Sequence, residues 1–568
     1  MDSPSTCWNE IHGGHVTVMI AARIMTTPSK QSPVRPAPRG GLFPGRLTRW
    51  IAGGSLLIVA LSRVLPKFDA VPWPWNDPAV GNILMLVFSF IAVVTVLIWL
   101  CFFSGHTRLV KRVVLFGAGM TVGIAIGLFR FEEVDGSMLP RFSPRWLPIH
   151  DRRLGKLEPA SSNLRADLTT TTTHDFPQFL GPNRDGYLPG PELARDWSSI
   201  PPRLHWKRPI GAGWSAFAAV NGFVVTLEQR GDEEWVTCYE IATGNPVWGH
   251  SIKARHENPM GGIGPRGTPT IHGGRVYALG ATGVLRCLDG ATGSLIWQQD
   301  VRSRYGLTDK QDEQLVQWGR AASPLIVDDL VVVPAGGESG KARSLIAFRA
   351  DSGEVAWEGG NEQISYASPS LATLGGVRQI TIVNESSVSG HDPKSGRELW
   401  QHPWPGNSSG NASASQAAVL PGDRLLISKG YGGGSELLEF KANGEGLAKP
   451  VTVWAGPRLL QTKFSNVVFI DGHLYGLSEG ILECVNPDTG ERKWKKGRYG
   501  HGQLLGVENL LLVISEAGTV SLVEANPHRW TELASFQAID GKTWNNPCLY
   551  GKKLLVRNGH EAACYELP

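Results

Sequence analysis

The sequence lacks the cysteine patterns that bind zinc or attach haem, since its seven cysteines form neither a CxxC pair nor a CxxCH motif. It also lacks a strong charge. A formal net charge of +4 over 568 residues provides no large basic surface for a nucleic acid. These absences argue against zinc-finger, c-type haem and nucleic-acid-binding proteins. We therefore predict no metal site and no nucleic-acid partner.

Turn-forming and aromatic residues, by contrast, are abundant. The chain contains 68 glycines, 38 prolines and 20 tryptophans. Glycine and proline interrupt helices and favour turns, so this composition fits an array of short strands better than a helical bundle. The many tryptophans indicate an aromatic role that is repeated along the chain.

One short unit recurs along the C-terminal two-thirds of the chain. The stretch 286–297 reads RCLDGATGSLIW, and near copies that keep the spacing from Gly to Trp lie at 238–248, 347–357, 390–400 and 484–494. Such periodicity predicts a repeat architecture, because one unit alone cannot bury its apolar face. Cys238, Cys287 and Cys484 share one position of the unit, so they lie on different units and we predict small buried residues, not disulfides.

A second element precedes each unit: a strand that opens with Ser or Thr, then a tight turn and an apolar run, as in GTPTIHGGRVYALG from Gly267. Each repeat is therefore predicted to hold four antiparallel strands. The tryptophans predicted to dock one repeat on the next are Trp206, Trp248, Trp297, Trp357, Trp400, Trp454, Trp494 and Trp530.

Eight such positions predict eight blades. The first has no preceding strands of its own, and the chain ends in a strand without a tryptophan, at 562–567. Joining the two ends completes one blade and removes the free sheet edges. The units that contain Trp454 and Trp530 depart from the pattern, so the blade count could differ by one there.

An apolar region precedes the repeats. Residues 80–103 carry no charge over a length sufficient to cross a bilayer, and two weaker spans flank them at 50–65 and 113–129. For the first of these, a helix lying in the membrane interface is the alternative. We predict four regions: a disordered cytoplasmic segment at 1–48, a membrane anchor at 49–130, a linker at 131–174 and a propeller at 175–568.

Basic residues predict the orientation of this anchor. Arg46 and Arg49 precede the first span, and Arg108, Lys111 and Arg112 lie between the second and the third. The positive-inside rule then places the N-terminus in the cytoplasm and the propeller on the outer side of the membrane. Aromatic residues in the first outer loop are expected at the membrane interface; they are Trp73 and Trp75.

Loops that lead into the first strand of each blade form a funnel at one end of a propeller. The candidate binding residues in these loops are Arg266, Arg320, Lys463, Arg230, Glu257, Trp214, Trp318, Tyr366 and Trp544. This basic and aromatic set suits an anionic or planar ligand, or an acidic loop of a partner. The alternative is a hydrated rim whose charges balance one another. If a site exists, Arg266 is the first choice.

The repeat, small-x-Asp-x-x-Thr-Gly-x-x-x-Trp, resembles the tryptophan-docking repeat of the pyrroloquinoline-quinone (PQQ) dehydrogenase propellers and of their non-catalytic relatives, which include an outer-membrane assembly lipoprotein. The resemblance covers about residues 175–568 and implies an all-β eight-bladed propeller behind an α-helical membrane anchor. It does not specify the cofactor. The dehydrogenases use calcium with Glu and Asn ligands and an Asp base, and many have a disulfide between adjacent cysteines; this sequence has no adjacent cysteines.

Two functions follow as alternatives. The first is a membrane-anchored, non-catalytic propeller that binds an envelope protein or polymer and needs no cofactor. The second is a membrane-bound PQQ-dependent alcohol or sugar dehydrogenase, which would need PQQ and calcium and would pass electrons to a membrane quinone. No stretch of the sequence matches the cofactor pocket residue by residue, and no catalytic residue is predicted.

Overall fold

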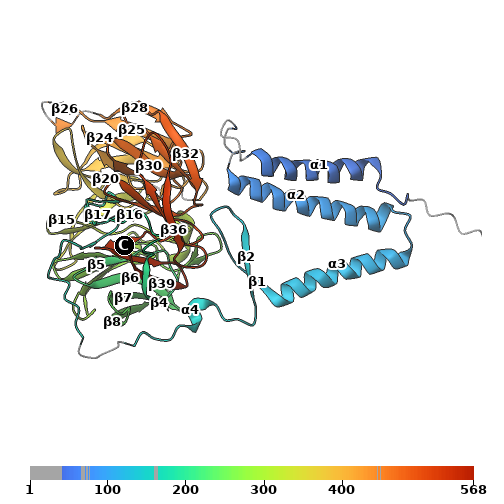
Figure 1. The fold of residues 1–568 in the computed structure, drawn as a ribbon, viewed down its shortest axis with the longest axis horizontal. Helices are drawn as coiled ribbons and strands as arrows, with labels where there is room; N and C mark the ends of the chain where they lie inside the picture. Colours follow the sequence, from blue (N-terminus) through green and yellow to red (C-terminus); the bar gives the residue numbers. More distant parts are fainter. Residues whose placement is uncertain are drawn as a thin grey trace, which may run out of the picture.

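The computed structural model describes residues 41–65, 71, 74–75, 77–158, 164–338, 340–407, 409–443, 446–447 and 449–568. A ring of β-sheets forms one part of the chain, and three long helices extend from one side of it (Figure 1). The segment predicted to be disordered lies outside the described residues up to residue 40, and so does Trp73.

Three helices are long and apolar enough to cross a membrane: α1 (Arg46–Val64), α2 (Pro78–Ile98, continued by a π-helical turn at Trp99–Phe103) and α3 (Arg108–Leu128). Each one coincides with a predicted span. Helices α1 and α2 lie side by side (Figure 1), and Arg63 of α1 donates to Asn82 Oδ1 of α2 at 2.8 Å. This hydrogen bond provides a partner for Arg63, the one charged side chain that interrupts the first span.

Eight sheets of antiparallel strands form the ring, as predicted. Blades 1 to 4 are, in order, β5 (Ala218–Val220), β6 (Phe223–Arg230), β7 (Glu233–Glu240) and β8 (Pro246–Lys253); β11 (Thr270–His272), β12 (Arg275–Leu279), β13 (Val284–Asp289) and β14 (Leu295–Asp300); β15 (Leu325–Val327), β16 (Leu330–Gly336), β17 (Arg343–Arg349) and β18 (Val355–Gly359); β19 (Ser370–Leu374), β20 (Val377–Val383), β21 (Ser387–His391) and β22 (Glu398–Pro403).

Blades 5 to 8 are β23 (Ala418–Leu420), β24 (Arg424–Lys429), β25 (Gly434–Glu439) and β28 (Val451–Gly456); β29 (Val468–Ile470), β30 (His473–Ser478), β31 (Ile481–Val485) and β32 (Arg492–Arg498); β33 (Gln503–Val507), β34 (Leu510–Ile514), β35 (Thr519–Glu524) and β36 (Glu532–Gln537), joined by β3 (Tyr187–Leu188); β37 (Cys548–Tyr550), β38 (Lys553–Arg557), β39 (Glu561–Glu566) and β4 (Arg203–Pro209). Two short hairpins lie outside the blades: β9 (Glu257–Asn258) with β10 (Gly262–Ile263), and β26 (Ala442–Asn443) with β27 (Gly446–Leu447).

The last blade confirms the predicted closure by both ends of the chain. Strand β39 at the C-terminus pairs with β4 at the start of the repeats, and Cys564 lies opposite Trp206. The same pairing of Cys with Trp joins Cys238 to Trp248 within blade 1. The prediction that Cys238, Cys287 and Cys484 are small buried residues is confirmed, since all three are free and buried.

The repeated turn explains why the unit requires its Asp, Thr and Gly. The Asp289 carboxylate accepts from the backbone N–H and the hydroxyl of Thr292, at 2.9 and 2.7 Å, and thereby closes the turn. Gly293 follows with φ +73°. A Cβ at this glycine would lie 2.5 Å from the ring of Trp248 in the preceding blade. Only glycine lets the tryptophan of one blade lie flat on the turn of the next.

Six of the predicted docking tryptophans donate their indole N–H to a backbone carbonyl in the next blade, at 2.7–3.0 Å; they are Trp206, Trp248, Trp297, Trp357, Trp454 and Trp494. Trp400 donates instead to the side chain of Gln379 in its own blade. It still packs on Phe440 of the next blade, with ring centroids 4.8 Å apart. The stretched turn of blade 5 accounts for this difference.

Trp530 corrects the prediction. It precedes β36 and packs on blade 6, the preceding blade, instead of on the next one. A Cβ at Gly497 of blade 6 would lie 2.8 Å from its indole nitrogen. Ala534, opposite Leu522 and beside the bulge, holds the position that the docking tryptophan has in other blades. The next blade is closed by β39 and β4 from the two ends of the chain, so it has no turn between its third and fourth strands on which this ring could dock.

Residues 131–174, which were predicted to be a linker, contain secondary structure that was not predicted. Its first part pairs β1 (Phe129–Val134) with β2 (Pro140–Pro144) in an antiparallel hairpin, and the short helix α4 (His150–Arg153) follows. The hairpin lies between the helices and the propeller (Figure 1). Charged residues of this segment pair with propeller residues that lie hundreds of positions away, so composition alone could not indicate the fold.

Candidate functional site: the central channel

A closed ring of hydrogen bonds surrounds the start of the innermost strands. Thr268 N–H donates to Ser323 Oγ, and Ser323 N–H donates to Ser368 Oγ, both at 2.9 Å. Bonds between neighbouring blades continue around the ring, through Ser365–Ser413, Gln416–Asn466, Gln503–Phe464, Gln503–Trp544, Asn545–Ser215 and Ala216–Thr268. Ser and Thr side chains therefore join blades 1 to 5 around the channel, and Gln and Asn side chains join the remaining blades.

The stretch 176–188, which reads FPQFLGPNRDGYL, occupies this channel. Phe176 bridges to Ala219 of blade 1, and β3 pairs with β33 of blade 7. The guanidinium of Arg184 donates to the carbonyl oxygens of Ser323 and Pro324 at 3.2 and 2.9 Å. Burial lowers the pKa of Arg184 to about 9. This segment is a core element that closes the channel from the side of the Thr-Gly turns.

The β1–β2 hairpin and the start of α2 cover the opposite end of the channel, where the predicted funnel lies. Gly136 N–H, in the turn of the hairpin, donates to Glu516 Oε1 at 2.6 Å. Lys463 Nζ lies 3.3 Å from Asp77 Oδ1, at the N-cap of α2, and 3.0 Å from Glu479 Oε2. Burial opposes the charge of Lys463, but these two carboxylates together raise its pKa.

Two predicted residues, Trp214 and Trp544, bind a lysine that sequence reasoning missed. Their ring centroids are 4.9 Å apart, and Lys542 Nζ lies 4.8 and 4.2 Å from them. Lys542 also forms an ion pair with Glu133 and donates to the carbonyl of Val134 at 3.0 Å. Burial raises the pKa of the Glu133 carboxyl and lowers that of Lys542, so the charge of each depends on the other.

Three further predicted residues, Arg266, Trp318 and Tyr366, lie together beside the loop at Gly261. Arg266 donates to the carbonyl oxygens of Gly261 and Gly264 at 2.7 and 2.8 Å, and the rings of Trp318 and Tyr366 are 5.1 Å apart. Burial lowers the pKa of Arg266 to about 10. These bonds hold the guanidinium against its own loop.

The other predicted residues form ion pairs at separate places. Arg320 lies 2.8 Å from Asp312 and donates to the carbonyl of Ala335 at 2.6 Å. Arg230 lies 3.2 Å from the buried Glu228, and the exposed Glu257 lies 2.7 Å from Arg255. The structure therefore divides the nine candidates among several environments, and their predicted binding role stays a prediction.

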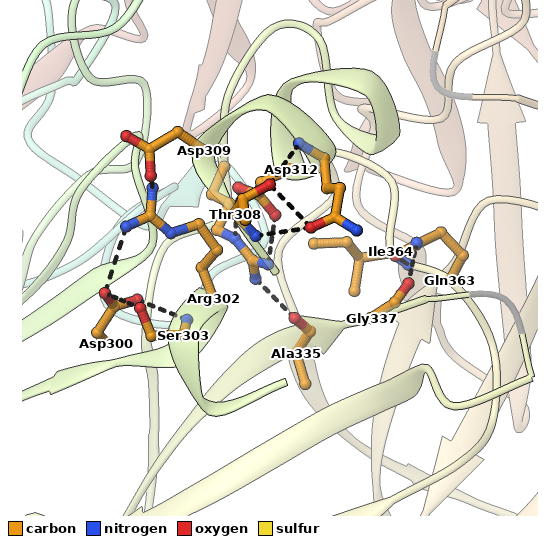
Figure 2. Close-up of polar contacts among 12 residues, drawn as sticks. Asp300, Arg302, Ser303, Thr308, Asp309, Asp312, Ala335, Gly337, Gln363 and Ile364 are labelled. Carbon is orange, nitrogen blue, oxygen red and sulfur yellow. Dashed lines mark hydrogen bonds and ion pairs between the residues drawn. The ribbon is translucent and has the colours of Figure 1, made fainter. Parts of the chain in front are cut away.

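Asp312 belongs to an insertion that the sequence reading missed. Between blades 2 and 3 lie α5 (Val301–Arg304) and α6 (Asp309–Leu315), where Arg302 reaches both Asp300 and Asp309 (Figure 2). Thr308 and Gln311 form a capping box at the start of α6. The spacing T-x-x-Q was the available sequence signal for this helix.

A cavity of about 250 Å³ lies where the hairpin and α4 meet the propeller. Its lining includes Arg130, Glu133, His150, Trp214, Lys542 and His560. The rings of His150 and His560 are 4.8 Å apart. Charges of both signs line this space, so it favours neither an anion nor a cation.

A calcium–quinone site, as in the enzymes that the repeat resembles, would require carboxylates that are available to a cation. Among the described residues, no group of three or more His, Cys, Asp or Glu side chains could hold a metal ion. The carboxylates at this end already have partners: Glu133 pairs with Lys542, Glu479 pairs with Lys463, and Glu516 accepts from Trp544 at 2.9 Å. The described residues therefore do not fit such a site.

Comparison with known proteins agrees with this architecture. Residues 232–496 match the family model described as outer membrane protein assembly factor BamB. No curated protein matches the chain. Among solved structures, a europium-containing methanol dehydrogenase is 11% identical with a TM-score of 0.54, covering 70% of this chain and 98% of that one.

BamB from Moraxella catarrhalis is 15% identical with a TM-score of 0.47, covering 64% of this chain and all of that one. A quinohemoprotein alcohol dehydrogenase from Comamonas testosteroni is 12% identical with a TM-score of 0.48, covering 69% and 80%. Likeness at such low identity concerns the fold alone. The chain thus forms an eight-bladed β-propeller, of which residues 232–496 match the model of this family, preceded by three helices apolar enough to cross a membrane.

Proposed function

We propose that this chain is a membrane-anchored, non-catalytic propeller that binds an envelope protein or polymer on the outer side of a bacterial cytoplasmic membrane. One observation carries the proposal: the chain itself closes both ends of its central channel. The segment 176–188 occupies the channel, and the hairpin with the start of α2 covers the end where Trp214 and Trp544 lie. A scaffold retains the rim and outer strands for binding, whereas a small substrate would need access to the channel.

The arrangement of the anchor supports the proposed orientation. The ends of α2 and α3 that meet the propeller region are Asp77 and Leu128. Arg46 of α1 and Lys111 of α3 lie near the helix ends that are farther from the propeller. At these ends, Gly105 N–H donates to the carbonyl of Gly41 at 3.0 Å. Basic residues at the end away from the propeller are what the positive-inside rule requires of a cytoplasmic side.

A cofactor titration tests the non-catalytic part of the proposal. The purified full-length protein is titrated with PQQ and calcium while absorbance and dye-linked oxidation of alcohols and sugars are followed. We expect no saturable binding at micromolar cofactor. Saturable binding with turnover would overturn the scaffold and support the dehydrogenase that is the alternative.

A variant with a displaced hairpin makes this titration more specific. Gly136→Val introduces a side chain where Glu516 Oε1 would lie 2.8 Å from the new Cβ, so the hairpin must move. If the variant also fails to bind PQQ, the channel itself lacks a cofactor site. Binding by the variant alone would mean that the hairpin conceals one.

A further inference from the structure

The hairpin is attached to the helical region at both of its ends. At its base, Arg145 N–H donates to the carbonyl of Leu128, the last residue of α3, at 2.8 Å, and Arg145 Nε donates to Ile126 at 2.7 Å. At its turn, the carbonyl of Ser137 accepts from Asn82 Nδ2, in the first turns of α2, at 2.7 Å. The hairpin therefore spans the distance between the ends of two helices (Figure 1).

If α2 and α3 cross the membrane, these two helix ends lie at the same membrane surface. A strand pair attached at both points must then run along that surface. One side of the hairpin is already used, because Glu133, Val134 and Gly136 contact the propeller through Lys542 and Glu516. The remaining side faces away from the propeller, toward the bilayer.

The remaining side carries aromatic rings. Phe131 lies opposite Phe142 in the register, with ring centroids 6.1 Å apart, and Phe129 contacts Trp146 at 6.5 Å. Phe142 is 61% and Trp146 is 64% exposed. Clustered exposed rings of this size indicate an interaction surface, and Trp is enriched where a membrane meets water.

One exposed arginine accompanies these rings. Arg145 adjoins Trp146 and is exposed, with its Nε bonded to the carbonyl groups at the end of α3. Arg141, by contrast, lies opposite Glu133 in the register and so belongs to the side that meets the propeller. Guanidinium groups bind phosphate well, and arginine commonly lies at headgroup level with its stem along apolar groups. Rings beside such an arginine match an anionic phospholipid surface better than a soluble partner.

We propose that the β1–β2 hairpin is a lipid-binding surface, in which Phe131, Phe142 and Trp146 enter the headgroup region while Arg145 contacts phospholipid phosphates. The inference rests on the proposed membrane anchoring. Its consequence is that the hairpin separates the propeller from the bilayer and fixes the covered end of the channel toward the membrane. The face with the Thr-Gly turns then points away from the membrane and is open to a partner.

Depth-dependent quenching tests this surface in the full-length protein. Cys7 and Cys101 are replaced by serine, because the other cysteines are buried, and a single environment-sensitive fluorophore is attached through Phe142→Cys. The protein is reconstituted into nanodiscs that contain phosphatidylglycerol with nitroxide groups either near the headgroup or deep in the acyl chain. We expect a blue-shifted emission and at least a twofold loss of fluorescence with the shallow nitroxide.

Two matched labels separate the possible results. Phe116→Cys lies on α3 at a site that is 73% exposed, and Ile200→Cys lies on the propeller at a site that is 63% exposed. We expect strong quenching of the first by the deep nitroxide and none of the second. Quenching at 116 without quenching at 142 would overturn the lipid surface and leave the anchor intact. If 116 is also unquenched, the anchoring fails and the lipid surface fails with it.

The lipid composition tests the role of Arg145. Replacing phosphatidylglycerol by phosphatidylcholine is expected to weaken the quenching at 142, and the variant Arg145→Gln is expected to do the same in anionic nanodiscs. Equal quenching in both lipids would overturn the assignment of this arginine to phosphate. Protection of position 142 only when a soluble envelope fraction is added would favour a protein partner and overturn the lipid.

Discussion

The two elements that close the central channel hold their positions by different kinds of contact. The segment 176–188 buries Phe176 and Leu188 in the propeller core, and its Arg184 bonds to backbone carbonyls. The hairpin places its charged side on the propeller, through Glu133 and Lys542, and leaves its aromatic side exposed. The first closure belongs to the propeller core, whereas the second is a polar contact between the hairpin and the propeller.

This difference has an energetic consequence. Buried apolar side chains stabilise the fold in proportion to the apolar area that they remove from water. A buried ion pair, by contrast, must first offset the cost of dehydrating both charges. We therefore expect changes to the channel segment to destabilise the entire propeller. Changes to the hairpin should release the hairpin locally and leave the propeller folded.

The largest effect is expected from Arg184→Ala. The substitution removes the donors to Ser323 and Pro324 and leaves a cavity in the channel, so we expect a loss of about 3 kcal/mol in the free energy of unfolding. Chemical denaturation in detergent, followed by tryptophan fluorescence, measures it. Arg195→Ala is the control, because its ion pair with Glu524 is half exposed and should contribute less than about 1 kcal/mol. Equal losses would contradict the structural role of the channel segment.

Gly136→Val should displace the hairpin with little effect on the propeller. Its added side chain overlaps Glu516, and such overpacking typically costs about 1–3 kcal/mol. Hydrogen exchange should accelerate in residues 133–139 and remain slow in the blade strands. Gly155→Val is the matched control, because a Cβ there meets nothing within 4 Å. Slower exchange at the hairpin, or unfolding of the blades, would not fit a local contact.

The ion pair of Glu133 and Lys542 can be measured by a double-mutant cycle. Lys542→Met removes the cation between Trp214 and Trp544, and Glu133→Gln removes its partner. We expect either change alone to increase hairpin opening roughly 10-fold, and the double variant to be less than additive, with a coupling of about 1 kcal/mol. Additive effects would mean that the two side chains act independently.

The smallest effect is expected from acidification. Burial and the nearby Lys463 lower the pKa of His501 well below 6.5, and the turn at Gly136 lies over its ring. The released state binds the proton more readily, so hairpin closure is fully stable above about pH 6.5 and weakens as the pH falls below it. At one pH unit below 6.5, the free energy of hairpin closure is weakened by at most about 1.4 kcal/mol, which corresponds to about 10-fold more opening.

Hydrogen exchange at pH 7.5 and 5.5, corrected for the intrinsic rates, measures this response. His501→Asn should abolish it, because the variant has no group that titrates there. A response that persists in the variant would assign the effect to other groups, such as the Glu133 carboxyl.

Much of the propeller could be predicted from local patterns. The five clear copies of the unit predicted the turn, the docking tryptophan and the buried cysteine, because each copy uses the same short-range geometry of Asp289, Thr292 and Gly293. The prediction was wrong at Trp530, whose ring packs on the preceding blade, because the next blade joins the two ends of the chain and has no turn to receive it. A tryptophan at the expected spacing is therefore insufficient without a turn in the following blade.

The candidate site was less predictable. Funnel residues such as Trp214 and Trp544 were named from their positions before the inner strands, and they do lie together. Their occupant, Lys542, and its partner Glu133 were missed, because they are separated by about 400 residues and carry no shared motif. Composition likewise indicated only a linker at 131–174, in whose first part a hairpin forms.

The sequence by itself determined the repeat, the number of blades, the closure by both ends of the chain and the three apolar helices, because these depend on periodicity and on hydrophobic length. Only the tertiary structure decided what fills the channel. Arg184 and Gly136 bind partners that only the closed ring brings together, because carbonyls and carboxylates from several blades converge there. Contacts of that kind depend on long-range geometry, which leaves no local pattern in the sequence.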